Sequence, residues 1–133
     1  MKKRLLYLIL PLVTLILEII PFGAVCNFAV YSPESTAKVH RVLCSYFDLV
    51  PFGYANFAPM FTALLTCIII TLMLFYCLFG KKRALTAVKI LLCVAAVISV
   101  CPILLGIKFY SIVGALITVS LIAEAIWLFK SEK

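Results

Sequence analysis

Three ionisable residues lie inside long apolar stretches of this chain: Glu18, Lys89 and Glu124. Holding such a side chain in lipid is costly, so an acid or base inside a membrane span is a functional suspect by default. Lys89 is six residues from Arg83 and Glu124 is six residues from Lys130, which places each about 9 Å inside its apolar stretch. If the two stretches are antiparallel neighbours, both side chains lie at one depth. We therefore predict a structural ion pair between Lys89 and Glu124.

This predicted ion pair has two interpretations. It could be a proton-linked or ion-linked site, or it could be a clamp that fixes the register of two helices, with Lys89 reaching toward the interface when unpaired. The clamp is preferred, because no second acid is expected at that depth. Glu18 lies about one turn from the far end of the first apolar stretch. We interpret it as a partly hydrated acid near the interface, capping a helix or pairing with Lys108 or Arg41.

No pattern in the sequence predicts catalysis. The chain has no glycine-rich phosphate loop, no Ser-His-Asp order and no H-E-x-x-H. Its six cysteines form no C-x-x-C, and none has zinc-ligand spacing with the single histidine, His40. We therefore predict no enzyme, catalytic residue, cofactor or metal. Cys26 and Cys44 are the candidate disulfide pair, since only these two cysteines fall in a segment expected to face outward.

The composition is that of an integral membrane protein. Of the 133 residues, 66% are hydrophobic and 13% are charged, whereas a soluble domain needs a polar exterior. Four stretches approach the roughly 20 apolar residues that cross a bilayer as a helix. They are predicted at about 5–22, 60–79, 84–105 and 109–129. We thus expect an all-α, polytopic membrane protein: a four-helix transmembrane bundle forming a single membrane domain over 1–133.

The basic residues predict the orientation of the spans. Nine of the twelve lysines and arginines lie on the side of the two ends and of the connection at 81–83, and three lie on the other side. Lysine and arginine in short loops favour the cytoplasmic side, so both termini are predicted to be cytoplasmic. The first stretch, which follows Lys2, Lys3 and Arg4, could instead be a cleaved signal peptide. Its length favours a retained span.

The outer loop, at about 23–59, is predicted to carry a short amphipathic helix over about 33–50. Ser32-Pro33-Glu34 is typical of a helix start, with serine as N-cap and proline in the first turn. Apolar residues then recur at helical spacing from Val39 to Val50, and Pro51 would end the helix. We expect this helix to lie flat on the outer membrane surface.

A repeated motif brackets that predicted helix. Pro21-Phe22-Gly23 is followed by Asn27, and Pro51-Phe52-Gly53 is followed by Asn56. Proline disfavours helix in the preceding residue and glycine tolerates a positive φ, so each copy is expected to end a helix. We hypothesise that the two copies meet at the outer surface and that both asparagines hydrogen-bond to helix ends.

Two function classes follow from these features. The first is a small multi-pass membrane protein without catalytic activity, an accessory or interaction protein that uses its outer loop and a small-residue stripe at Ser111, Gly114, Ala115 and Thr118. The alternative is a small oligomeric transporter or channel that uses Glu18 or the Lys89/Glu124 pair. Expected partners are the lipid bilayer and either a second copy or another membrane protein. Nucleic acid is not expected, because the basic residues cluster beside apolar runs.

Overall fold

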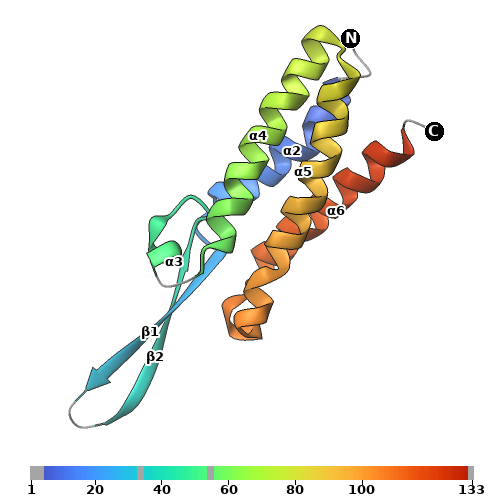
Figure 1. The fold of residues 1–133 in the computed structure, drawn as a ribbon. Helices are drawn as coiled ribbons and strands as arrows, with labels where there is room; N and C mark the ends of the chain where they lie inside the picture. Colours follow the sequence, from blue (N-terminus) through green and yellow to red (C-terminus); the bar gives the residue numbers. More distant parts are fainter. Residues whose placement is uncertain (1–4, 33–34, 54–55, 132–133) are drawn as a thin grey trace.

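The computed structural model describes residues 5–32, 35–53 and 56–131, and Figure 1 shows a mostly helical chain with one β-hairpin. The helical elements are η1 (Leu6–Leu8), α2 (Ile9–Ile19), α3 (Leu49–Gly53), α4 (Ala58–Phe79), α5 (Lys82–Val100), η2 (Cys101–Leu105), η3 (Ile107–Phe109) and α6 (Ile112–Lys130). The hairpin consists of β1 (Ala24–Ser32) and β2 (Ser35–Cys44).

Three helical segments are long and apolar enough to cross a membrane: α4, α5 continued through η2 to Leu105, and α6. They match the predicted stretches at 60–79, 84–105 and 109–129. The predicted first span at 5–22 corresponds to a shorter apolar helix over Leu6–Ile19, so four spans are not confirmed. This helix stops because Ile20 is extended, with ψ 133°, as expected for a residue before proline.

The predicted amphipathic helix over 33–50 is wrong, because most of that segment forms β2. β2 pairs antiparallel with β1, with Ala24 opposite Cys44 and Phe28 opposite His40. β1 is rich in β-branched and aromatic residues, which suit a pleated ladder. Only a short helix, α3, follows near the end of the segment. Of the predicted helix start, Pro33 and Glu34 lie outside the described residues.

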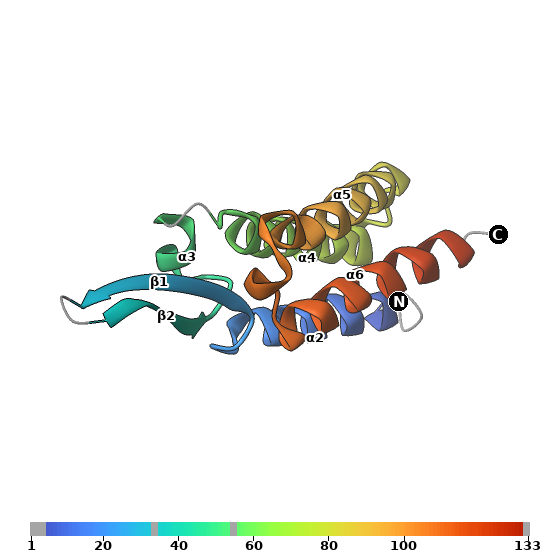
Figure 2. The ribbon, with the colours of Figure 1, turned by 90° about the horizontal axis from the view of Figure 1, so that it is seen from below.

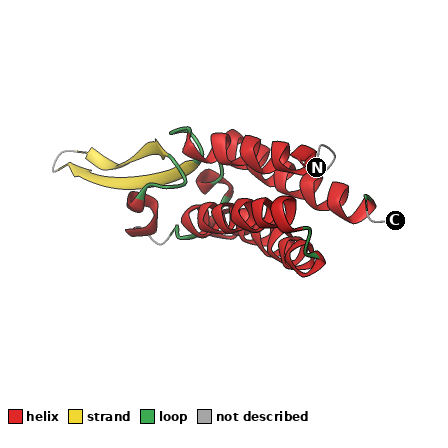
Figure 3. Ribbon diagram, turned by 90° about the horizontal axis from the view of Figure 1, so that it is seen from above, coloured by secondary structure: helices red, strands yellow, loops and turns green. Residues whose placement is uncertain are grey.

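The helices form two layers. Figures 2 and 3 show α4 and α5 side by side in one layer and α2 with α6 in the other. α4 turns into α5 at Gly80, whose φ of 67° is the left-handed value typical of a helix end. The core between the layers includes Met73 of α4, Leu92 of α5 and Leu121 of α6. The hairpin extends away from this core, beyond the ends of the helices (Figure 1).

Candidate functional site: two buried carboxyl groups beneath an outer hairpin

Two acids, Glu18 of α2 and Glu124 of α6, are buried in the helical bundle at 0% and 1% exposure. Oε1 of Glu18 lies 2.8 Å from the hydroxyl oxygen of Thr66 on α4. The second oxygen of Glu18 and both oxygens of Glu124 have no hydrogen-bond partner. Buried polar atoms in native proteins are nearly always paired, so three orphaned carboxyl oxygens mark this region as functionally interesting.

A pair of hydroxyl groups lies between the two acids. Thr14 Oγ1 of α2 and Ser120 Oγ of α6 are 2.7 Å apart and join the two helices. Each acid follows its hydroxyl by four residues, or one helical turn, and the two helices run in opposite directions (Figure 2). Helical side chains lean toward the N-terminus of their own helix, so each carboxyl leans back toward the hydroxyl pair. We call Thr14, Glu18, Thr66, Ser120 and Glu124 the polar seam.

The polar seam has a sequence signal that sequence reasoning missed. Residues 14–18 read TLILE and residues 120–124 read SLIAE, which is a hydroxyl residue, Leu-Ile, a variable position and an acid. The two segments are far apart in the chain and antiparallel in space. A search for internal repeats finds them only if a five-residue match is accepted inside apolar sequence, where short matches arise easily.

No hydrogen bond joins Glu124 to Lys89, and their ion pair stays a prediction. The Lys89 ammonium lies over the ring of Phe129, 5.1 Å from its centre, while Glu124 is buried without a hydrogen-bond donor. The interpretation of Glu18 as a partly hydrated interfacial acid is wrong, because its side chain is fully buried against Thr66. Arg41 donates instead to the backbone oxygen of Tyr110, at 3.4 Å.

The base of the hairpin is fixed on the bundle by Tyr46. Its ring is 2% exposed, and its backbone N–H donates to the carbonyl oxygen of Glu18 at 2.9 Å. Two glycines lie against the ring. A Cβ on Gly23 would lie 2.8 Å from Tyr46 Cδ1, and a Cβ on Gly114 would lie 3.2 Å from the hydroxyl oxygen of Tyr46. Ser111 caps α6 by accepting from the N–H of Gly114, and it donates to the carbonyl of Gly23.

The small-residue stripe on α6 therefore has a defined use. Gly114 admits the ring of Tyr46, while Thr118 lies 3.0 Å from the hydroxyl of Ser99 on α5 and 2.6 Å from that of Tyr110. The stripe thus contacts the hairpin base and α5 of the same chain. These contacts occupy part of the surface that the sequence analysis offered to a second copy.

The two copies of the repeated motif adopt different structures. Pro21 follows the end of α2 as predicted, whereas Pro51 and Phe52 lie within α3, where proline is tolerated in a first turn. Asn56 of the second copy contacts β1, the strand that follows the first copy, because its side-chain amide donates to the carbonyl oxygen of Val25 at 3.1 Å. The backbone N–H of Asn56 donates to the carbonyl oxygen of Pro51. Asn27 is half-buried on β1, opposite Arg41.

This difference predicts unequal effects of two matched substitutions. Asn56→Ala should lower the free energy of unfolding by about 1–3 kcal/mol, because the buried carbonyl of Val25 loses its donor. Asn27→Ala should change it by less than about 1 kcal/mol, as for partly exposed polar positions. Thermal unfolding in detergent measures both. Equal losses for the two variants would contradict the assignment of Asn56 as the structural asparagine.

Cys26 and Cys44, the candidate disulfide pair, are both buried and both free thiols. Since Cys44 faces Ala24 and Cys26 faces Val42, they are diagonal neighbours on one face of the hairpin, close enough to hydrogen-bond. Burial raises the pKa of the Cys26 thiol to about 11, with the neighbouring Cys44 thiol and the Asp48 carboxylate adding to the effect. Burial and Asp48 also raise the pKa of Cys44. The disulfide itself remains a prediction.

Cys26 should therefore react slowly with thiol reagents. The thiolate is the nucleophile, and a pKa of about 11 leaves little thiolate near neutral pH. The rate of alkylation should rise about tenfold for each pH unit below that pKa, as the thiolate fraction does. A cysteine at the exposed position Val39, in a chain lacking the native cysteines, is the matched control and should react faster. Equal rates at neutral pH would contradict this environment for Cys26.

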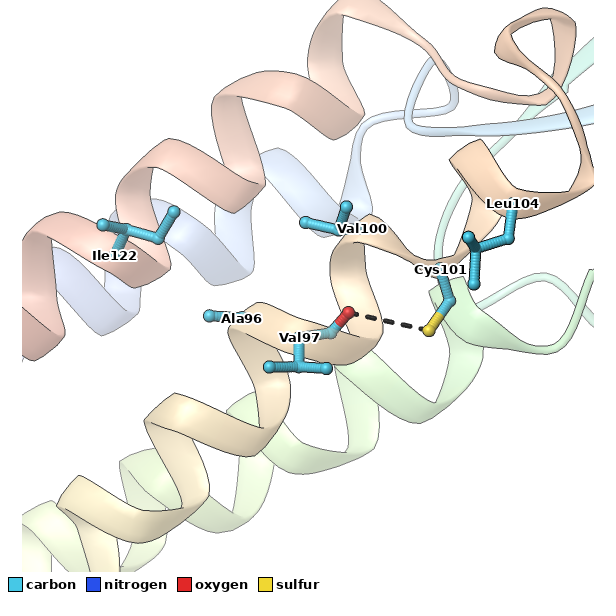
Figure 4. A pocket seen from close by; sticks show the side chains of 6 residues that line it. All are labelled: Ala96, Val97, Val100, Cys101, Leu104 and Ile122. Atoms are coloured by element: carbon cyan, nitrogen blue, oxygen red, sulfur yellow. Dashed lines mark hydrogen bonds between the residues drawn. The ribbon is translucent and has the colours of Figure 1, made fainter.

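A groove of about 530 Å³ at the hairpin base is lined in part by Arg41 and Ser111, whereas three others, on the helices, are apolar. One of about 460 Å³ is lined by Ala96, Val97, Val100, Cys101, Leu104 and Ile122, and Figure 4 shows these side chains along α5 and α6. Its one drawn polar contact is the thiol of Cys101 donating to the carbonyl of Val97 at 3.6 Å. A groove of this kind suits an acyl chain or another helix. Among the described residues, no group of three His, Cys, Asp or Glu could hold a metal ion.

Comparison with protein-family models, with curated proteins and with solved structures finds no match to this chain.

Proposed function

We propose that this chain is a multi-pass membrane protein without catalytic activity that binds another membrane or envelope protein through its β1–β2 hairpin. The observation that carries the proposal is the position of the hairpin, which extends beyond the helices while its base is fixed on them (Figure 1). A segment held in this way is presented to the outside in a defined orientation. That arrangement suits recognition, because little ordering entropy is lost when a partner binds.

The strand edges of the hairpin suggest how a partner would bind. Among the described residues no further strand pairs with β1 or β2, so each strand offers backbone N–H and C=O groups to an extended segment of another chain. β1 packs against α3 and η3 near its base, which favours β2 as the edge that accepts the segment. Val39 and Arg41 are exposed on β2 and could contact side chains of the partner.

The proposed membrane arrangement has four helices in the bilayer with both ends inside. The α4–α5 connection, the start of η1 and the end of α6 lie at one end of the bundle, opposite the hairpin (Figure 1). Lys81, Lys82, Arg83 and Lys130 are exposed at this end, as expected for the cytoplasmic side. The shorter helix Leu6–Ile19 begins at this same end (Figure 1).

A topology map tests this arrangement. Single cysteines in a cysteine-free chain are probed on intact cells with a thiol reagent that cannot cross the membrane. A cysteine at Val39 should be labelled, and one at Lys82 should be protected until the cells are opened. Labelling at Lys82 on intact cells would overturn the orientation.

Photocrosslinking tests the proposed binding. A photoreactive residue at Val39, 67% exposed on β2, is compared with one at Val97, 69% exposed on α5. We expect irradiated membranes of the native cell to give a discrete protein adduct from position 39 and lipid adducts from position 97. Because the two positions are almost equally exposed, a difference between their adducts reports location and not accessibility. Failure to form a protein adduct at Val39, Phe28 and Arg41 would overturn the proposal.

The transporter alternative is favoured by one observation, the two buried acids of the polar seam. Against transport of a solute by a single copy, three of the grooves on the helices are lined almost entirely by apolar side chains. We therefore retain the interaction protein as the proposed function.

A further inference from the structure

The polar seam contains two buried acids without a basic partner in hydrogen-bonding contact. The titratable groups that act electrostatically with Glu18 are Tyr46 beside the hairpin, Cys67 of α4 and Glu124 of α6. On the part of α6 that follows Glu124, the ring of Trp127 contacts that of Tyr7, and the ring of Phe129 lies under the Lys89 ammonium. An unpaired carboxylate in such a place is very unfavourable, so the neutral acid is the stable form.

Counting hydrogens on Thr66 leads to the same result. Its hydroxyl oxygen lies 2.8 Å from Glu18 Oε1 and 3.1 Å from the carbonyl oxygen of Thr62. A hydroxyl has one hydrogen to donate, and a carbonyl oxygen can only accept. If Thr66 donates to Thr62, the contact with Glu18 is satisfied only when the carboxyl of Glu18 carries a proton and donates it to Thr66.

The hydroxyl pair can be counted in the same way. Thr14 Oγ1 lies 3.1 Å from the carbonyl of Leu10 and 2.7 Å from Ser120 Oγ. When Thr14 donates to Leu10, Ser120 must donate to Thr14, so neither hydroxyl has a hydrogen left for a carboxylate. The oxygens of Glu124 have no hydrogen-bond partner, so a negative charge on this acid would stay uncompensated.

We propose that the polar seam is a proton-binding site that holds one proton on Glu18 and one on Glu124. The proposal rests on the membrane embedding of the bundle and is independent of partner binding by the hairpin.

Carbodiimide labelling tests proton binding. Dicyclohexylcarbodiimide enters lipid and adds to protonated carboxyl groups, which gives a stable adduct that mass spectrometry locates. With the full chain in phosphatidylcholine vesicles near neutral pH, we expect adducts on Glu18 and Glu124 and none on the exposed Asp48. Labelling should fall as the pH is raised. Absence of adducts at both glutamates, or protection by sodium ions at constant pH, would overturn the proposal.

Discussion

Tyr46→Ala is expected to lower the free energy of unfolding by about 3–5 kcal/mol, the range measured when large buried aromatic residues are truncated. The ring is 2% exposed and fills the space between Gly23, Gly114 and the end of α2. Its removal leaves a cavity that the two glycines cannot easily close, because Ser111 hydrogen-bonds to the backbone of both and holds them in place. Thermal and denaturant unfolding in detergent measure the loss.

The adjacent residue provides the control. Phe47 is 42% exposed, so Phe47→Ala removes an aromatic ring of similar size that is not enclosed by the bundle. We expect it to lower stability by less than about 1 kcal/mol, as for most surface changes. If both alanine variants are equally destabilised, the hairpin base is not fixed by Tyr46.

Gly23→Ala is expected to cost about 1–3 kcal/mol, as overpacking of a tight contact does. The new methyl group would lie 2.8 Å from Cδ1 and 3.0 Å from Cε1 of Tyr46. These are ring atoms of a buried side chain, so they cannot move away as a flexible chain end would. Unfolding in detergent measures this loss as well.

The second copy of the repeated motif supplies a matched control for Gly23. A Cβ on Gly53 would meet nothing within 4 Å, so Gly53→Ala should be neutral or slightly stabilising. The double variant Gly23→Ala with Tyr46→Ala should cost less than the sum of the two, because removing the ring also removes the clash. Additive losses would show that Gly23 and Tyr46 act separately.

Sequence reasoning predicted the apolar helices because hydropathy is local: α4, α5 and α6 need only their own residues to be identified. It failed at the hairpin, since the apolar spacing of Val39, Val42 and Leu43 suits a helix face when β1 is not considered. What decides the structure there is a cross-strand ladder between residues about 20 positions apart. The Pro-Phe-Gly copies misled for a related reason, because the same three residues end one helix and lie within another.

The candidate site was predicted only in part. Glu18 and Glu124 were identified from their chemistry, which does not depend on the fold. Their relation was missed, because α6 packs on α2 as well as α5, and the sequence analysis compared α6 mainly with its neighbour in the chain. Lys89 was assigned to Glu124 from depth alone, whereas the direction of each side chain around its helix decided the contact.

The backbone hydrogen bond from Tyr46 to Glu18 gives the hairpin a mechanical consequence. The hairpin extends beyond the helices, and the ring of Tyr46, packed against Gly23 and Gly114, fixes its base. A force on the far end of the hairpin would act through this hydrogen bond on the last turn of α2, at Glu18, the residue that carries the buried carboxyl group. In the proposed membrane arrangement, a force on the hairpin outside the membrane therefore acts on the residue whose carboxyl group is buried inside it.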